Sequence, residues 1–226
     1  MLRLSNTLPK ILCIIADDSE ARPLLEQLSF QHIDVHLYRC KPRNPPLLLD
    51  VYIVDHWGGP AVLAALETYP QALTHYDLWI NMGFAGSCSI KLSLGTCYTV
   101  NCVAKLNQEP IPNLSEEPKL FPIPIDSLPR AFLVTTHVPY CHGFHKTFQL
   151  VDMEGYAIAL QATKHQIPYR ILKIASDYTL PNSSQQIRAH THQLAIELSE
   201  VFIKILPEIF ETTIASTLLS RTPPLS

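Results

Sequence analysis

The sequence predicts a single α/β domain, a three-layer α/β/α sandwich around a mixed, largely parallel sheet. Short, continuous apolar runs alternate with helical segments along the 226 residues, the order that builds parallel sheets covered on both faces. The chain is 47% hydrophobic and 16% charged, a composition typical of a globular protein with a sizeable core. We therefore expect one domain over residues 1–226, with mostly buried strands.

The apolar and turn patterns place the elements in chain order. The expected strands cover residues 11–16, 33–38, 47–54, 77–82, 97–103, 131–136 and 169–175. The expected helices cover residues 21–28, 60–69 and 153–164, followed by a C-terminal helix that Asn182 or Ser183 would cap and that continues through Leu206. The glycines of the segment Gly83–Ser87 predict a loop after the fourth strand.

Two segments depart from this regular pattern. Six prolines fall within residues 107–129, a density that predicts a long ordered loop without regular elements. Strands follow it directly, so an interdomain linker is less favoured; a lid, an oligomer contact and plain surface irregularity stay open. The tail at 211–226 ends in Arg221-Thr222-Pro223-Pro224 and is expected to be frayed.

Charge and composition argue against several function classes. The net charge is −3 without a long basic run, which gives nucleic-acid binding little support. No apolar run approaches the ~20 residues of a membrane helix, and the run Ile11–Ala16 is too short for a signal-peptide core. The six cysteines include no C-x-x-C pair, so we expect buried free thiols in a reducing cytoplasm.

Histidines are numerous, but their spacing does not favour a metal site. The segment from Cys141 to His145, C-H-G-F-H, could suggest one. It lies in an expected loop and lacks a second ligand pair at a recognisable spacing. We therefore expect neither a metal ion nor another cofactor.

Acidic side chains stand at the ends of three expected elements. Glu20 follows the first strand, Glu154 lies in the cluster Asp152-Met153-Glu154 where a helix opens, and Asp177 follows the last strand. Parallel sheets bind ligands at the carboxyl ends of their strands. Taken singly, each acid has a simpler structural explanation, because Asp152 and Asp177 can cap helices and the glutamates favour the helix dipole. Together they predict a carboxylate-lined cleft.

The strings around these acids resemble a known superfamily. The stretch from Val151, V-D-M-E-G-x-A-I-A, precedes a strand that ends A-S-D at Asp177. This combination resembles the nucleosidase branch of the purine nucleoside phosphorylase superfamily, which includes methylthioadenosine/S-adenosylhomocysteine nucleosidase and futalosine hydrolase. The segment Asn81–Gly86 is similar to the superfamily's N-x-G-x-A-G loop, and the segment that begins at Leu92 to its L-x-x-G-D-V-V turn, with Thr96 where Asp is common. The resemblance implies a nucleoside phosphorylase-like fold.

The resemblance also implies a role for each acid. Glu20 is the best match to the glutamate that activates water, with Asp17 and Asp18 as open alternatives. Asp177 would donate a proton to N7 of the purine, and Glu154 would accept hydrogen bonds from ribose hydroxyls. The other implied substrate contacts are Met153, Phe84, Ala85, Gly86 and Ser176, with Val138 or Tyr140 near the purine.

This set of acids suits the cleavage of an N-ribosidic bond. The purine is a poor leaving group and the ribose develops positive charge, so an acid is needed on the base side and a base on the water side, as in glycoside hydrolases. Each contributes about 10²–10⁴-fold. To hold a proton near neutral pH, the carboxyl of Asp177 must be buried.

Water is favoured over phosphate as the nucleophile. Asp17 and Asp18 at the end of the first strand would repel an anion, Arg22 lies a turn into the following helix, and no arginine accompanies the loop at Gly83–Ser87. A phosphorylase, a non-catalytic nucleoside-binding relative and an unrelated doubly wound protein remain alternatives.

The substrate expected from the resemblance is a 5′-substituted purine nucleoside. Asp177 suits adenine, and Phe84, where methylthioadenosine nucleosidases usually have a small polar residue, suggests a larger or more apolar 5′ side. We expect futalosine or aminodeoxyfutalosine, intermediates of menaquinone biosynthesis, with methylthioadenosine or S-adenosylhomocysteine as further substrates. The resemblance further implies a homodimer.

Overall fold

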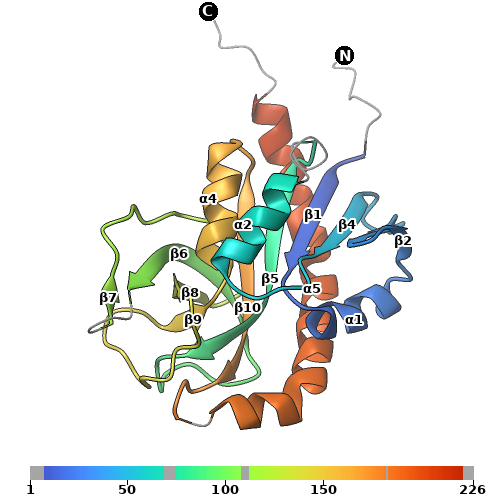
Figure 1. Ribbon diagram of the computed structural model, residues 1–226. Helices are drawn as coiled ribbons and strands as arrows, with labels where there is room; N and C mark the ends of the chain where they lie inside the picture. Colours follow the sequence, from blue (N-terminus) through green and yellow to red (C-terminus); the bar gives the residue numbers. More distant parts are fainter. Residues whose placement is uncertain (1–7, 69–74, 108–111, 182, 221–226) are drawn as a thin grey trace, which may run out of the picture.

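The computed structural model describes residues 8–68, 75–107, 112–181 and 183–220. Within these residues, ten strands form one sheet with helices on both of its faces (Figure 1). The strands are β1 (Lys10–Ile15), β2 (Gln31–Asp34), β3 (Leu37–Cys40), β4 (Leu48–Ile53), β5 (Leu78–Ser87), β6 (Cys97–Asn107), β7 (Asn113–Leu114), β8 (Arg130–Thr135), β9 (Leu150–Asp152) and β10 (Tyr169–Asp177). The helices are α1 (Asp18–Gln27), α2 (Gly59–Thr68), α4 (Gly155–Lys164) and α5 (Ser183–Ser220).

The sheet is mixed, and part of it closes on itself. Its strand order is β10-β6-β8-β9-β5-β1-β4-β3-β2, with β7 paired to β6. Parallel pairings join β1 to β4 and β5, β5 to β10, and β8 to β6 and β9. An additional pairing between β10 and β5 closes β5, β9, β8, β6 and β10 into a ring. Because β1 and β10 both pair in parallel with β5, the carboxyl ends of these three strands meet at one edge of the sheet.

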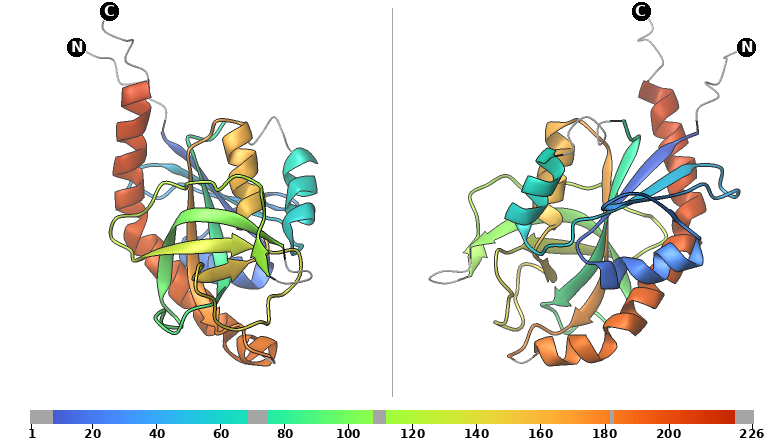
Figure 2. Two further views of the ribbon diagram at one scale, coloured as in Figure 1. Left: turned by 90° about the vertical axis from the view of Figure 1, so that its left-hand side faces the viewer. Right: turned by 45° about the vertical axis from the view of Figure 1, so that its right-hand side comes forward.

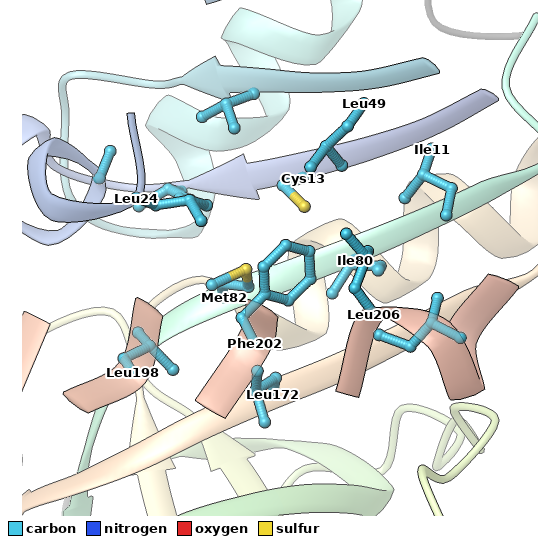
Figure 3. Close-up of a cluster of buried hydrophobic side chains, with 14 of the residues drawn as sticks. Ile11, Cys13, Leu24, Leu49, Ile80, Met82, Leu172, Leu198, Phe202 and Leu206 are labelled. Atoms are coloured by element: carbon cyan, nitrogen blue, oxygen red, sulfur yellow. The ribbon is translucent and has the colours of Figure 1, made fainter. Parts of the chain in front are cut away.

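Helices cover the sheet in two layers, as the sequence predicted. The left view of Figure 2 shows α5 on one side of the sheet and α2 with α4 on the other. Phe202 points from α5 toward Ile80 and Met82 of β5 and is completely buried (Figure 3). On the opposite face, Val62 of α2 and Ile158 of α4 belong to a second buried cluster. The predicted α/β/α sandwich is confirmed.

Three local predictions of secondary structure are wrong. Residues 33–38 form parts of the hairpin β2–β3 instead of one strand; Asp34 accepts a hydrogen bond from the N–H of Val35 and supports a turn that contains no glycine or proline. Residues 83–87 belong to β5 because β10 and β9 provide backbone partners for them. Residues 150–152 form β9, so α4 begins at Gly155.

The proline-rich segment contains more regular structure than predicted. In its described part, β7 pairs with β6, and Leu120 exchanges both backbone hydrogen bonds with Val103. These pairings are possible because the paired residues stand between the prolines and keep their N–H groups. The hydroxyl of Tyr156 donates to the carbonyl of Pro118, and Arg170 donates to that of Pro124. Whether the segment serves as a lid or an oligomer contact stays a prediction.

The C-terminal helix is longer than the sequence suggested. α5 continues through Pro207 to Ser220, so the expected fraying is wrong for residues 211–220, and residues 221–226 lie outside the described part. Ile209 and Thr213 are buried, and Ile209 belongs to the main hydrophobic core, which ties this turn of the helix to the sheet. The Thr213 hydroxyl donates to the carbonyl of Ile209 within the helix. The predicted cap at Asn182 or Ser183 also lies outside the described residues and side chains.

Two further features concern the environment of the chain. All six cysteines are free thiols, and Cys13, Cys40, Cys88 and Cys97 are buried. Within the described ranges, no helix combines the length and the apolar character needed to cross a membrane.

Candidate active site

A cavity of about 290 Å³ opens where the carboxyl ends of β1, β5 and β10 meet. Its walls come from the start of α1, the end of β5, the loop after β8, the junction of β9 with α4, and the end of β10. This is the place where parallel α/β sheets usually bind ligands. The cavity brings together all three predicted acids, Glu20, Glu154 and Asp177.

Glu20 lies in the first turn of α1. The helix begins three residues earlier than predicted, because the side chain of Asp17 caps it by accepting the N–H of Ser19 at 2.8 Å. Oε1 of Glu20 accepts the N–H of Phe84 at 3.4 Å. Burial raises the pKa of Glu20 to about 8, with Glu154 and Asp17 adding to the rise and Lys173 opposing it.

The two alternatives to Glu20 are engaged elsewhere. Asp17 lines the cavity, but its carboxylate caps α1. Asp18 forms an exposed ion pair with Arg22 at 2.5 Å. The geometry therefore favours Glu20 over both.

Glu154 is the N-cap residue of α4 and is buried. Its Oε1 accepts the N–H of Gly58, from the loop before α2, at 2.8 Å. Burial raises its pKa, the neighbouring Asp152 raises it further, and Lys173 opposes both effects. A buried carboxylate that lines a cavity is suited to accept hydrogen bonds from a polar ligand.

Asp177 ends β10 and is 4% exposed, as the predicted role required. One carboxylate oxygen accepts the hydroxyl of Ser176 at 2.7 Å, and the other accepts the N–H of Thr179 at 2.8 Å. Thr179 itself has a left-handed φ of 54°. These two hydrogen bonds fix the orientation of the carboxyl group.

Sequence reasoning missed a buried ion pair behind the acids. Nζ of Lys173 lies 2.8 Å from Oδ2 of Asp152, and both side chains are almost inaccessible. Asp152 also accepts the hydroxyl of Thr135 at 2.6 Å and the N–H of Gly155 at 2.9 Å. Burial lowers the pKa of Lys173, but the carboxylates of Asp152 and Glu154 outweigh burial and raise it. A lysine inside the apolar run at 169–175 was the available signal.

The remaining predicted contacts fall on the cavity wall with one exception. Residues from the prediction that line the cavity are Met153, Phe84, Ala85, Gly86, Ser176 and Tyr140. Val138 is 54% exposed and is not among the described lining residues. Trp57, Thr136, Pro139 and Thr179 also line the cavity and were not singled out from the sequence, since most belong to loops without a recognisable pattern. Cys141 lines it too, although the sequence suggested it only as a candidate metal ligand.

The histidine-rich loop gives no sign of a metal centre. His145 stacks on Phe148 with ring centroids 3.9 Å apart, and His142 contacts the edge of Tyr140. In the described part of the chain, no three His, Cys, Asp or Glu side chains are grouped to hold a metal ion.

The fold and the site define a class of protein. A three-layer sandwich with a mixed sheet, part of it closed into a ring, and three acids around one strand-end cavity is the arrangement expected of a nucleoside phosphorylase-like protein. Comparison of the sequence with family models and with curated proteins found no match.

Comparison with solved structures identifies the family. The MTAN of Chlamydia trachomatis bound to MTA is 33% identical, with a TM-score of 0.78 over 89% of this chain and 99% of that chain. Its adenine-bound structure is also 33% identical, with a TM-score of 0.77 over 91% and 100%. The Helicobacter pylori 5′-methylthioadenosine/S-adenosylhomocysteine nucleosidase (MTAN) shares the fold. It is 14% identical, with a TM-score of 0.75 over 90% of this chain and 100% of that chain. The chain belongs to the MTAN family, in the nucleosidase branch of the purine nucleoside phosphorylase superfamily.

Proposed function

We propose that the chain hydrolyses the N-ribosidic bond of a 5′-substituted purine nucleoside. The observation that carries this proposal is the placement of Glu20, Glu154 and Asp177 around one cavity. The Chlamydia trachomatis relative has been solved with MTA and with adenine, a nucleoside and its free base. Those ligands support a site that accepts both the substrate and the product of such a reaction.

On the purine side, Asp177 is the proton donor. The departing purine needs a proton at N7, and a buried carboxyl held by Ser176 and Thr179 can present it in a fixed direction. The same carboxyl can accept a hydrogen bond from a 6-amino group, which favours adenine.

On the opposite side, Glu20 is the general base. Its pKa of about 8 makes the ionised carboxylate basic enough to take a proton from an attacking water near neutral pH. Glu154 accepts hydrogen bonds from the ribose hydroxyls and places negative charge beside the sugar as it becomes cationic. The N–H of Gly58 holds Glu154 in position for this contact.

The electrostatics of the cavity favour water over phosphate. Among the described residues that line it, none is an arginine or a lysine, whereas Asp17, Glu20 and Asp152 all contribute to the wall. A phosphorylase needs cationic donors for its anionic nucleophile. A phosphorylase and a non-catalytic binding protein are therefore the weaker alternatives.

The 5′ side favours an apolar substituent. Phe84 lines the cavity, and Trp57, which is 68% exposed, also contributes to its wall. Both suit the aromatic 5′ group of futalosine or aminodeoxyfutalosine, which would place the chain in menaquinone biosynthesis. Methylthioadenosine and S-adenosylhomocysteine are the second candidates, and the MTA-bound relative favours them.

The free thiols suit a cytoplasmic protein. We also expect a homodimer whose partner closes the 5′ side of the cavity.

Product analysis by chromatography tests the proposal. The purified protein is incubated without phosphate, separately with aminodeoxyfutalosine, futalosine, methylthioadenosine and S-adenosylhomocysteine. We expect release of free purine, a loss of at least about 10²-fold in rate for Asp177→Asn, and no loss for the control Asp126→Asn, whose side chain is 80% exposed. Release only with added phosphate would indicate a phosphorylase. Binding without release in either buffer would leave the non-catalytic alternative.

A further inference from the structure

The buried pair Lys173–Asp152 has no direct part in the proposed reaction, in which Asp152 serves only as part of the cavity wall. Their side chains are 2% and 1% exposed, and Nζ lies 2.8 Å from Oδ2. The free energy lost when two charges are removed from water offsets much of the free energy gained from their attraction. Replacing such a pair by apolar side chains is therefore often neutral or stabilising. Stability is therefore a weak explanation for this pair, and its position beside the cavity suggests another one.

The surroundings of the pair hold it rigidly. Asp152 accepts hydrogen bonds from the Thr135 hydroxyl and the N–H of Gly155, so its carboxylate is fixed from two elements. Lys173 stands opposite Gly83 in the register of β10 and β5. A Cβ at position 83 would lie 3.5 Å from Nζ of Lys173 and 2.7 Å from Oε2 of Glu20. The ammonium and the carboxylate thus border the same space beside Gly83, without forming an ion pair of their own.

Charges face Glu20 from three directions. Lys173 approaches from β10, Glu154 from the start of α4, and Asp17 from the start of α1. Lys173 in turn is faced by Asp152, Glu154 and Glu20. Without Lys173, the group would consist of carboxylates that repel one another, and a buried like-charge group favours protonation of its members.

We propose that Lys173, anchored by Asp152, is a positioning residue that acts on Glu20 through its charge and balances the negative charge of Glu20 and Glu154. Lys173 is not among the described residues that line the cavity, so it acts through Glu20 rather than on the substrate. This inference rests on the proposed function, because it assigns Lys173 to the base of that reaction.

The test compares the pH profile of kcat/KM for charge-neutralising variants. Lys173→Met removes a positive charge, so Glu20 loses its proton less readily and the rising limb of the profile moves to higher pH. Asp152→Asn removes a negative charge from the same group, so the limb moves to lower pH. The double variant restores the balance, so its limb returns toward the wild-type position. Each displacement by one pH unit changes kcat/KM about tenfold on the limb.

Controls separate positioning from a structural role. Asp50→Asn breaks the partly buried ion pair that Asp50 forms with Arg39 at 2.7 Å, away from the cavity, and should lower the unfolding temperature without moving the profile. Lys173→Arg keeps the charge and should retain the limb. The inference would be overturned if the rising limb of the kcat/KM profile moved in the same direction in both single variants. It would also be overturned if the limb stayed at the wild-type position in the single and double variants alike.

A second readout keeps this inference separate from the proposed function. The pH dependence of the unfolding temperature reports the titration of Glu20, identified by its loss in Glu20→Gln, without any substrate. If the wild-type protein releases no purine, the proposed function fails. The opposite displacements of this titration in Lys173→Met and Asp152→Asn would still support the charge balance, and their absence would refute it.

Discussion

At the scale of single residues, the environment of Glu20 gives an ordinary side chain its chemical character. Burial, together with the nearby carboxylates of Glu154 and Asp17, makes ionisation of Glu20 unfavourable and outweighs the N–H of Phe84 and the ammonium of Lys173, which favour the ionised form. Such a group takes a proton more readily than an exposed one. The same environment has a cost in stability, because the unfolded chain ionises this group freely.

Glu20→Gln should therefore remove a pH-dependent loss of stability. The pKa of Glu20 rises from 4.5 in an ordinary carboxyl to about 8 in the fold, so its contribution is fully present below about 4.5 and is lost as pH rises through 8. Between pH 5 and 9, we expect the free energy of unfolding of Glu20→Gln to gain up to about 4 kcal/mol on the wild-type protein.

Urea unfolding at pH 5, 7 and 9 measures this difference. Glu67→Gln, at an exposed position of α2, serves as the control and should follow the wild-type protein at every pH. A constant offset between Glu20→Gln and the wild-type protein across this range would contradict the assignment.

At the scale of elements, the glycines of β5 illustrate how close packing decides a sequence pattern. Gly83 and Gly86 predicted a loop, yet both lie in a paired strand. A Cβ at Gly86 would lie 2.4 Å from Cγ2 of Thr179, and one at Gly83 would lie 2.7 Å from Oε2 of Glu20. The glycines thus allow the side chains of the site to approach the strand.

Gly83→Ala should accordingly impair activity through Glu20. The added methyl group displaces the Glu20 carboxylate, the base of the proposed reaction, and we expect kcat to fall by at least about 10²-fold. Steady-state kinetics with the preferred nucleoside measure this. The matched control is Gly59→Ala at the start of α2, where the new Cβ would meet its nearest neighbour, Cβ of Ala157, at 3.5 Å. Equal kcat in the two variants would contradict the role of Gly83.

Sequence patterns predicted the elements where one signal dominates. The apolar runs of β1, β4 and β10 needed no tertiary information, because strands buried on both faces are apolar throughout. The hairpin β2–β3 and the three-residue β9 were missed, since their pairing depends on neighbours that are distant in sequence. The acids at element ends were visible, whereas the role of Lys173 depends on a partner that only the fold brings near.

At the scale of the whole molecule, ring closure assembles the site from segments far apart in sequence. β10 pairs with both β5 and β6, and β9 pairs with both β5 and β8. The ring brings Glu154 and Asp177 to one cavity, and the pairing of β1 with β5 adds Glu20, although the three acids are distant along the chain. α5 packs against β5 and β10 on the face of the sheet that α2 and α4 do not cover, and it fixes the relative positions of these strands (Figure 3).

The packing of α5 should therefore govern stability more than chemistry. Phe202 is fully buried between α5 and the sheet, in one cluster with Met82 of β5 and Leu172 of β10. Phe202→Ala leaves a cavity there and should lower the free energy of unfolding by about 3–5 kcal/mol. Because Phe202 does not line the active-site cavity in the described structure, KM of the folded variant should remain that of the wild-type protein.

Urea unfolding and kinetics at low temperature, where the variant stays folded, separate these two effects. Phe121→Ala removes an aromatic side chain of the same size whose residue is 69% exposed, and its free energy of unfolding should change by no more than about 0.5 kcal/mol. If Phe202→Ala were as stable as Phe121→Ala, the helix would not anchor the sheet as its packing indicates. If KM rose together with the loss of stability, the strand ends that carry the acids would depend on α5 for their geometry as well as for their stability.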